Sequence, residues 1–244
     1  MIFNQHALKV PAAEPRPAEW TIAGTRLTLT VEGGLHLAEA STLVVADLHL
    51  EKASAFAARG QMLPPYDTAA TLKRLAALIH RLRPARVIAL GDSFHDRGAG
   101  ARLAEGDRAT LTALTALTEW IWIAGNHDPE PPNGLGGWAT SELSIGSLTF
   151  RHEPRPGRAV GEVAGHLHPS ARVVGRGRSV RRRCFAANGE RLIMPAFGAL
   201  AGGLNVLDRA FHPLFEGRAF HAFMLGVDVH PVAGQRLVGE ERTA

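Results

Sequence analysis

Three short apolar segments, each followed at once by a polar turn, place the strongest constraint on how this chain can fold. The segments and their turns are 41–46 before Asp47-Leu48-His49, 86–90 before Gly91-Asp92, and 121–124 before Gly125-Asn126-His127-Asp128. Short apolar runs that end at such turns are typical of buried strands. In an open α/β sheet, ligand-binding groups gather at the carboxyl ends of parallel strands. The sequence therefore predicts such a sheet, with these polar side chains along one edge.

Helical patterns lie between these segments. A helix is predicted from Asp67 or Thr68, which can cap it, to about Leu82, because apolar residues recur at helical spacing and Pro84 follows. A second helix is predicted within residues 99–118. Its apolar stripe is Leu103, Leu111, Leu114 and Leu117. The order strand, helix, strand, helix, strand predicts parallel strands joined by right-handed crossovers.

The second half of the chain has a different character. From Ser141 onward, short alternating segments follow one another with turn residues between them, and Asn188-Gly189 is a clear hairpin signal. We expect this half to be mostly β and to stack as a second sheet on the first, since candidate ligands occur in both halves. Residues 1–20 are predicted to be an irregular arm and residues 21–244 a single domain.

Composition narrows the class of protein and its surroundings. Of the 244 residues, 45% are hydrophobic and 20% are charged, which is ordinary for a globular domain. The single cysteine, Cys184, excludes an intrachain disulfide and suits a reducing compartment. The sequence shows no signal peptide and no apolar run of the ~20 residues that cross a bilayer. We therefore expect a cytoplasmic protein that does not span a membrane.

The net charge of +4 is unevenly distributed along the chain. Between Arg155 and Arg191 the sequence has nine Arg and two Glu. An arginine run is usually a solvated strand face, but the planar guanidinium also suits phosphate, which it binds without reading a base sequence. Arg181, Arg182 and Arg183 are therefore candidate nucleic-acid contacts.

The chain carries seven potential metal ligands in five turns. They are Asp47, His49, Asp92, Asn126, His152, His166 and His168. In an extended segment residues i and i+2 point the same way, so the pairs 47/49 and 166/168 are each expected to aim two donors at one place. Carboxylate, imidazole and amide donors without a thiolate suit Mn, Fe, Zn or Co. The set exceeds the needs of one ion and predicts two metals about 3.5–4 Å apart.

This ordered set resembles the signature of the calcineurin-like metallophosphoesterases over about residues 42–170. The resemblance implies an α/β fold, a four-layer α-β-β-α sandwich of two mixed β-sheets flanked by helices. It implies a first metal held by Asp47, His49, Asp92 and His168, and a second held by Asp92, Asn126, His152 and His166, with Asp92 bridging. It also implies hydrolysis by a bridging hydroxide, with His127 as the catalytic residue that protonates the leaving group or steadies the transition-state charge.

One position departs from the pattern of the serine/threonine phosphatase branch. There, an Asp that orients the catalytic histidine stands four residues after the Gly of the Gly-Asp motif, whereas this chain has His95 at that position and Asp96 next. The partner that orients His127 is therefore left open, and a protein phosphatase is disfavoured. His95 and Asp96 are expected either to contact the substrate or to support the ligands from behind.

A closer resemblance covers nearly the whole chain. Its motifs are 45–52 (VADLHLEK), 60–68 (GQMLPPYDT), 91–96 (GDSFHD), 151–154 (RHEP) and 195–198 (PAFG). They resemble the bacterial ligase-associated DNA-damage-response metallophosphoesterases, which implies a Mn-dependent phosphodiesterase, a DNA endonuclease acting in repair beside a DNA ligase and a helicase. The spacing alone reaches only phosphoester hydrolysis. Two alternatives stay open: a phosphoesterase for a nucleotide or lipid precursor, and a metal-binding partner of a repair assembly with weak activity.

Overall fold

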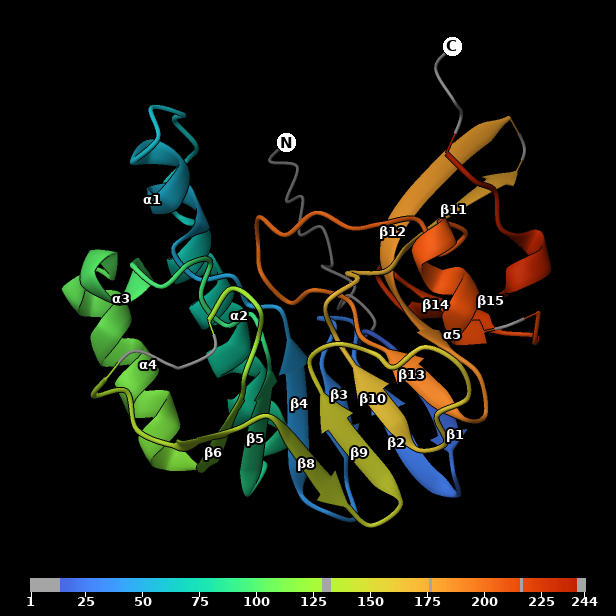
Figure 1. The fold of residues 1–244 in the computed structure, drawn as a ribbon, viewed down its shortest axis with the longest axis horizontal. Coiled ribbons are helices and arrows are strands. Elements are labelled where there is room, and N and C mark those ends of the chain that lie inside the picture. The colour runs from blue at the N-terminus through green and yellow to red at the C-terminus, as the bar shows by residue number, and fades with distance from the viewer. Residues whose placement is uncertain (1–13, 129–132, 176, 216, 241–244) are drawn as a thin grey trace, which may run out of the picture.

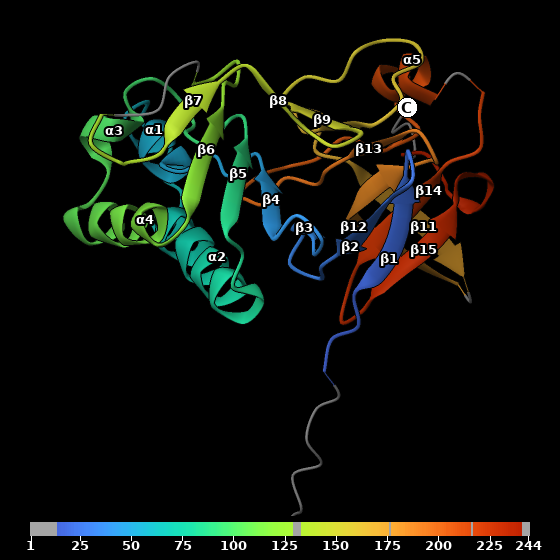
Figure 2. The ribbon, with the colours of Figure 1, turned by 90° about the horizontal axis from the view of Figure 1, so that it is seen from below.

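Two β-sheets pack face to face, with helices on the outer face of each (Figures 1 and 2). The computed structural model describes residues 14–128, 133–175, 177–215 and 217–240 of the chain. Both sheets contain parallel and antiparallel pairs, so both are mixed. The predicted fold class, a four-layer α-β-β-α sandwich, is confirmed.

The first sheet carries the three predicted ligand-bearing strands side by side. Its described strands, in spatial order, are β1 (Ala18–Ile22), β2 (Thr25–Leu29), β3 (Leu35–Leu37), β4 (Thr42–Ala46), β5 (Arg86–Leu90), β6 (Glu119–Ile123) and β7 (Trp138–Thr140). The strands from β4 to β7 run parallel, whereas β1 to β4 are antiparallel neighbours. The carboxyl ends of β4, β5 and β6 therefore lie at one edge of the sheet, as predicted.

Four helices follow β4 and β5 in the chain and make the crossovers of this sheet. They are α1 (Lys52–Ala57), α2 (Asp67–Leu82), α3 (Ala99–Arg102) and α4 (Glu105–Leu117). Leu72, Leu75 and Leu78 of α2 are buried against the face of β4 that presents Leu43 and Val45. The predicted helix from residue 67 to about 82 is confirmed.

The predicted cap of α2 is wrong, because its side chains have other partners. The residue before α2 is Tyr66, and no side chain caps the helix. Asp67 accepts a hydrogen bond from the N–H of Ala53 at 3.1 Å, and Thr68 accepts one from the N–H of Glu51 at 2.8 Å. Both side chains thus fasten α1 to the start of α2.

The helix predicted within residues 99–118 is divided in two. It breaks between α3 and α4, where Leu103 has a non-helical backbone with φ −59° and ψ 118°. Leu111 and Leu114 are buried as predicted. Leu117 is 72% exposed, so its assignment to the apolar stripe is wrong. Leu117 is the last residue of α4 and lies beyond the part of the helix that packs on the sheet.

The second half of the chain is mostly β, as predicted. Its described strands are β8 (Glu142–Ile145), β9 (Leu148–Arg151), β10 (Glu162–Ala164), β11 (Ser170–Gly175), β12 (Arg178–Ala187), β13 (Arg191–Ile193), β14 (His221–Leu225) and β15 (Val229–Ala233). β12 and β13 form the hairpin predicted at Asn188-Gly189. Among the described strands, β11 pairs only with β12. The β11–β12 hairpin projects beyond the sheet (Figure 1). The outer layer is thin: η1 (Arg209–Phe211), α5 (His212–Phe215) and η2 (Gly234–Arg236).

Alternation along each strand divides the apolar residues between the layers. In β12, Phe185 belongs to the core between the two sheets, whereas Cys184 belongs to the core under η1 and α5. In β4, Val44 and Ala46 face the second sheet. This follows from the opposite directions of successive strand side chains.

The N-terminal segment joins the sandwich earlier than expected. β1 begins at Ala18, so the last three residues of the predicted arm are in a strand. Arg16 pairs with Asp228 at 2.7 Å. Residues 1–13 of the predicted arm lie outside the described residues, and so do residues 129–132 of the predicted loop after Asp128. Within the described part of the chain, the helices lack the length and apolar character needed to cross a bilayer.

Candidate metal centre

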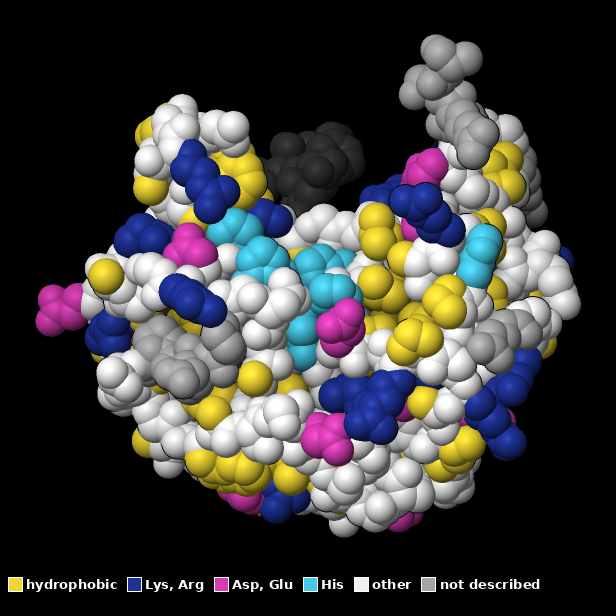
Figure 3. All heavy atoms as spheres, in the orientation of Figure 1, with side chains coloured by type: hydrophobic (Ala, Val, Ile, Leu, Met, Phe, Trp, Pro, Cys, Tyr) yellow, Lys and Arg dark blue, Asp and Glu magenta, His cyan; other side chains and the backbone are white. Residues whose placement is uncertain are grey.

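The predicted metal ligands come from both sheets and meet at one edge of the sandwich. They follow β4 (Asp47, His49), β5 (Asp92), β6 (Asn126), β9 (His152) and β10 (His166, His168). Figure 3 shows histidine side chains gathered in a hollow between the projection that carries α1 and the β11–β12 hairpin. The structure brings all seven residues together, in two adjoining clusters.

The first cluster consists of Asp47, His49 and His168, whose donor atoms lie within 4.8 Å of one another. The two imidazole Nε2 atoms are 3.1 Å apart, and Nε2 of His168 is 3.3 Å from Oδ1 of Asp47. Asp47 is fully buried, and the backbone N–H of His166 lies 3.0 and 3.2 Å from its two oxygens. The carboxylate is therefore held in place before any ion binds.

The second cluster consists of Asp92, His152 and His166. Nε2 of His152 is 3.4 Å from Oδ2 of Asp92 and 3.2 Å from Nδ1 of His166. Asn126 joins this cluster, since its Oδ1 is 2.8 Å from His152 and 3.0 Å from His166. The same Oδ2 atom of Asp92 is 4.0 Å from Nε2 of His49, so Asp92 stands between the two clusters.

Two of the donors, His49 and Asp92, have protonation states that fit a bound cation. Burial, together with the charge of His168, lowers the pKa of His49 to about 3, so this imidazole is neutral at neutral pH. Burial acts to raise the pKa of Asp92, but the hydrogen bonds and charges of His152, His127 and His49 together outweigh it, and the pKa falls to about 2. Ligands must be deprotonated to bind a metal, and these two already are. Converging lone pairs of nitrogen and carboxylate oxygen suit a divalent ion.

Several of these residues adopt a left-handed backbone that side chains disfavour. Asp47, His49, Asp92, His166 and His168 have φ between 43° and 68°. Strained backbone of this kind clusters at functional sites, where the surrounding fold holds it in place. It also corrects a prediction: the pairs 47/49 and 166/168 are not extended. The two histidines of the second pair consequently point into different clusters.

Two glycines make room for the carboxylates. A Cβ at Gly125 would overlap the backbone nitrogen and side chain of Asp92, and a Cβ at Gly165 would lie 2.6 Å from Oδ2 of Asp47. Any other residue at these positions would push a carboxylate out of its cluster. The glycines that end the apolar segments therefore serve close packing around the centre.

His127 stands beside the two clusters and is 44% exposed. Its Nδ1 is 3.0 Å from the main-chain oxygen of His95, and its Nε2 is 3.9 Å from Oδ2 of Asp92. The ring of His95 stacks on it, with centroids 5.6 Å apart. Asp96 has other partners, since it accepts hydrogen bonds from Arg102 at 2.7 Å and from Gly98. The partner of His127 is thus a carbonyl, which has no signature in the sequence.

Comparison with known proteins identifies the family. Residues 40–194, more than half of the chain, match the family of calcineurin-like phosphoesterases. The chain belongs to this family. With the two clusters described above, it is a metallophosphoesterase with two candidate metal sites.

Two solved structures are similar to this phosphoesterase. The crystal structure of Pseudomonas putida nuclease MPE matches with 28% sequence identity and a TM-score of 0.69, over 89% of this chain and 100% of that chain. Yfce, a phosphoesterase from E. coli, matches with 15% identity and a TM-score of 0.40, over 81% of this chain and 98% of that chain. A search of curated proteins gives no match.

Asp128 has no role in the predictions from the sequence, but its side chain links two turns of the phosphoesterase centre. Its Oδ2 accepts a hydrogen bond from the N–H of Phe94 at 2.9 Å, joining the turns after β5 and β6. Burial raises the pKa of this carboxyl to about 7, and the negative charge of Asp92 adds to the effect. Its place at the end of the Gly-Asn-His-Asp turn was the available signal.

The three arginines predicted to contact nucleic acid do not share one face of β12. Arg181 pairs with Glu240 at 2.9 Å, and Arg183 donates to the carbonyl of Ala196 at 2.6 Å. Arg182 is exposed and, by strand alternation, points to the opposite side. Arg176, in the same basic run, lies outside the described residues.

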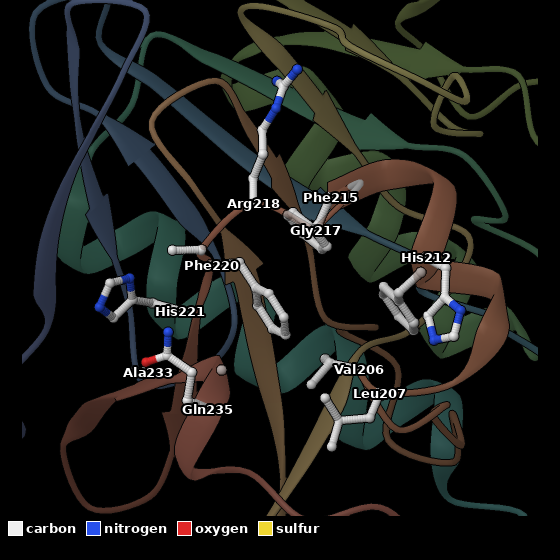
Figure 4. A pocket seen from close by; sticks show the side chains of 13 residues that line it. Val206, Leu207, His212, Phe215, Gly217, Arg218, Phe220, His221, Ala233 and Gln235 are labelled. Carbon is white, nitrogen blue, oxygen red and sulfur yellow. The ribbon is translucent and has the colours of Figure 1, made fainter.

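A separate pocket of about 520 Å³ lies beside η1 and α5 (Figure 4). Phe211, Phe215 and Phe220 line it, and none of its described lining residues is acidic or belongs to either cluster. Its described wall is mainly apolar and carries no carboxylate to join His212 and His221 as a metal ligand. The pocket is therefore separate from the candidate metal centre.

Proposed function

We propose that this phosphoesterase is a two-metal phosphodiesterase that cleaves DNA internally, in DNA repair. The observation that carries the proposal is the pair of adjoining clusters on either side of Asp92, whose Oδ2 is 3.4 Å from His152 and 4.0 Å from His49. The likeness to nuclease MPE supports a nucleic acid as the substrate class. The solvent exposure of Asn126 and His127 also favours a phosphodiester within a long chain, because such a substrate needs an open site.

The residues assigned to each metal follow the two clusters. The first metal would be held by Asp47, His49, Asp92 and His168, and the second by Asp92, Asn126, His152 and His166. We propose Mn, with Fe, Zn or Co as alternatives that the same donors accept. Two such cations supply Lewis acidity toward the phosphoryl oxygens and lower the pKa of water. Asn126 contributes an oxygen without a charge, so the centre stays cationic enough to attract a phosphate.

His127 is the proposed general acid. Its Nδ1 donates to the carbonyl of His95, which leaves Nε2 as the atom that gains and gives the proton. Nε2 faces Asp92, so the proton is delivered at the metal centre. A DNA alkoxide is a poor leaving group and needs this proton.

His95 and Asp96 complete the proposal. We place the ring of His95 against the substrate, because it stacks on His127 and its buried Nδ1 has no hydrogen-bond partner among the described residues. Asp96, fixed by Arg102, holds the segment whose carbonyl orients His127. Asp96 is thus a positioning residue.

A nuclease assay tests the proposal against its alternatives. The Mn-loaded protein should nick closed circular DNA, and the activity should disappear with a chelator or with Asp92→Asn. Hydrolysis of nucleotide or lipid-precursor esters without cleavage of single- or double-stranded DNA would indicate a small-molecule phosphoesterase. Metal binding without hydrolysis of any ester would indicate a non-enzymatic partner protein.

A further inference from the structure

The segment 195–198 crosses the carboxyl end of β4, next to the first cluster. The N–H of Phe197 donates to the carbonyl of Ala46 at 2.7 Å, and the N–H of Gly198 donates to the carbonyl of Asp47 at 3.1 Å. A side chain fixed on this segment therefore lies close to Asp47.

Two guanidinium groups, from different layers of the sandwich, donate hydrogen bonds to carbonyls of this segment. Arg74, on α2, donates to the carbonyl of Phe197 and lies 4.4 Å above its ring. Arg183, on β12, donates to the carbonyl of Ala196 at 2.6 Å. Arg183 is paired across the hairpin with Ser170, which follows His168 of the first cluster by two residues. Both cations thus stand on the side of the centre that the first cluster occupies.

Neither cation is paired with a carboxylate in the described part of the chain. Their hydrogen-bond acceptors are neutral main-chain carbonyls, and neither guanidinium forms an ion pair there. Glu32, whose charge acts on Arg74, is already bound through both oxygens to Arg81, at 2.7 and 3.0 Å. Two half-buried like charges beside each other are unfavourable, and an anion would relieve the repulsion.

Burial disfavours the charge of both groups, and the repulsion between them acts on Arg74. Burial, with the charge of Arg183 adding, lowers the pKa of Arg74 to about 10. Burial also lowers the pKa of Arg183. Both remain cationic at neutral pH and hold donors for an incoming anion, since a guanidinium has five N–H groups.

The direction of Arg183 sets it apart from its neighbour in the basic run. Phe185, two residues on, faces the first sheet, so Arg183 faces the same way, and its charge acts on Arg74 of α2. Arg182 shares the opposite face with Cys184. Arg181 is on the same face of the strand as Arg183, but it pairs with Glu240 at 2.9 Å.

We propose that Arg74 and Arg183 form a subsite for a second phosphate of the nucleic-acid strand, adjacent to the phosphate held at the metal centre. This inference rests on the proposed function, that the centre acts on a phosphodiester within a nucleic acid. Guanidinium groups recognise the phosphate through charge and paired N–H donors, so the subsite positions a strand without reading its sequence. It favours polymeric over minimal diesters.

The test compares Arg74→Gln/Arg183→Gln with Arg182→Gln, which removes a charge from the other face of the same strand. With Mn-loaded protein, the double variant should raise KM for a single-stranded oligonucleotide by about 10-fold to 100-fold, the range for losing hydrogen bonds to charged groups. The salt dependence of binding should flatten by about 0.7 per lost phosphate contact. On bis(p-nitrophenyl) phosphate, the loss in kcat/KM should be much smaller.

Two results would overturn the subsite. One is equal KM values for the double variant and Arg182→Gln. The other is an equal loss on both substrates, which would mean that the arginines only hold the segment 195–198. If the double variant misfolds, Arg183→Gln should show part of the effect and Arg183→Lys should recover most of the affinity.

The subsite and the nuclease activity can fail separately. If the wild-type protein hydrolyses the chromogenic diester but leaves DNA intact, the proposed function fails. Oligonucleotide binding that still depends on Arg74 and Arg183 would keep the subsite even then. Absence of oligonucleotide binding by the wild-type protein would overturn it.

Discussion

At the scale of single residues, His127 separates proton transfer from metal binding. Its Nδ1 is engaged by the carbonyl of His95, and its Nε2 is 3.9 Å from Asp92, outside both clusters. His127→Ala should therefore keep both metals. Cleavage of DNA should fall by about 10²–10⁴-fold, because the alkoxide loses its proton donor. A nitrophenolate leaves without help, so a nitrophenyl diester should lose far less.

The comparison of these two substrates in steady-state kinetics decides the role of His127. Equal losses on both would indicate positioning or electrostatic stabilisation in place of acid catalysis. Loss of a metal from the purified variant would make His127 a ligand.

Asp128 should make the metal-free protein less stable as pH rises. The pKa of its carboxyl is about 7 in the folded protein, and its ordinary value of 3.8 applies to the unfolded chain. In that window the unfolded chain releases the proton while the folded chain keeps it, so the free energy of unfolding falls with rising pH. Asp128→Asn mimics the protonated form and should gain stability relative to wild type between about pH 4 and pH 8. Urea unfolding at each pH measures this, and a difference that does not change with pH would show that Asp128 is ionised in the folded protein.

At the scale of elements, α1 depends on buried hydrogen bonds more than on its own six residues. The hydroxyl of Thr68 accepts from the N–H of Glu51 at 2.8 Å and donates to its carboxylate at 2.9 Å. Thr68→Val should lower the free energy of unfolding by about 1–3 kcal/mol, because a buried donor and acceptor lose their partner. Thr110→Val on the exposed face of α4 is the matched control and should change it by less than about 0.5 kcal/mol. Equal effects in urea unfolding would refute a special role for Thr68.

The sequence predicted the elements whose pattern is local. The periodicity of α2, the apolar runs of β4, β5 and β6, and the hairpin at Asn188-Gly189 each depend on neighbouring residues, and the structure confirms them. The break between α3 and α4 and the short α1 were not predicted, since packing on other elements decides them. The left-handed turns at His49 and His166 also escaped prediction, because such backbone is imposed by the surrounding fold.

For the candidate site, the gathering of all seven predicted ligands followed from the order of strands and turns. The contacts of His127 and Arg74 could not be predicted from the sequence. Both side chains bind main-chain carbonyls, and every residue has a carbonyl, so the sequence does not mark the partner. The roles of the ligands stay predictions until metals are measured.

At the scale of the whole molecule, the centre joins the two sheets. Asp47, His49, Asp92 and Asn126 come from the first sheet, and His152, His166 and His168 come from the second. A metal that binds only the folded protein stabilises it by about 2.7 kcal/mol at a hundred times its Kd. Mn should therefore raise the Tm of the wild-type protein, and a chelator should lower it. An unchanged Tm under saturating Mn would contradict a centre that bridges the sheets.

The metal content of purified Asp92→Asn, measured beside its activity, tests the central claim most directly. Asp92 stands between the clusters, so the account predicts about two metals per chain in the wild-type protein and fewer in the variant, with loss of phosphodiester hydrolysis. An Asp92→Asn protein that keeps both metals and full turnover would contradict the account.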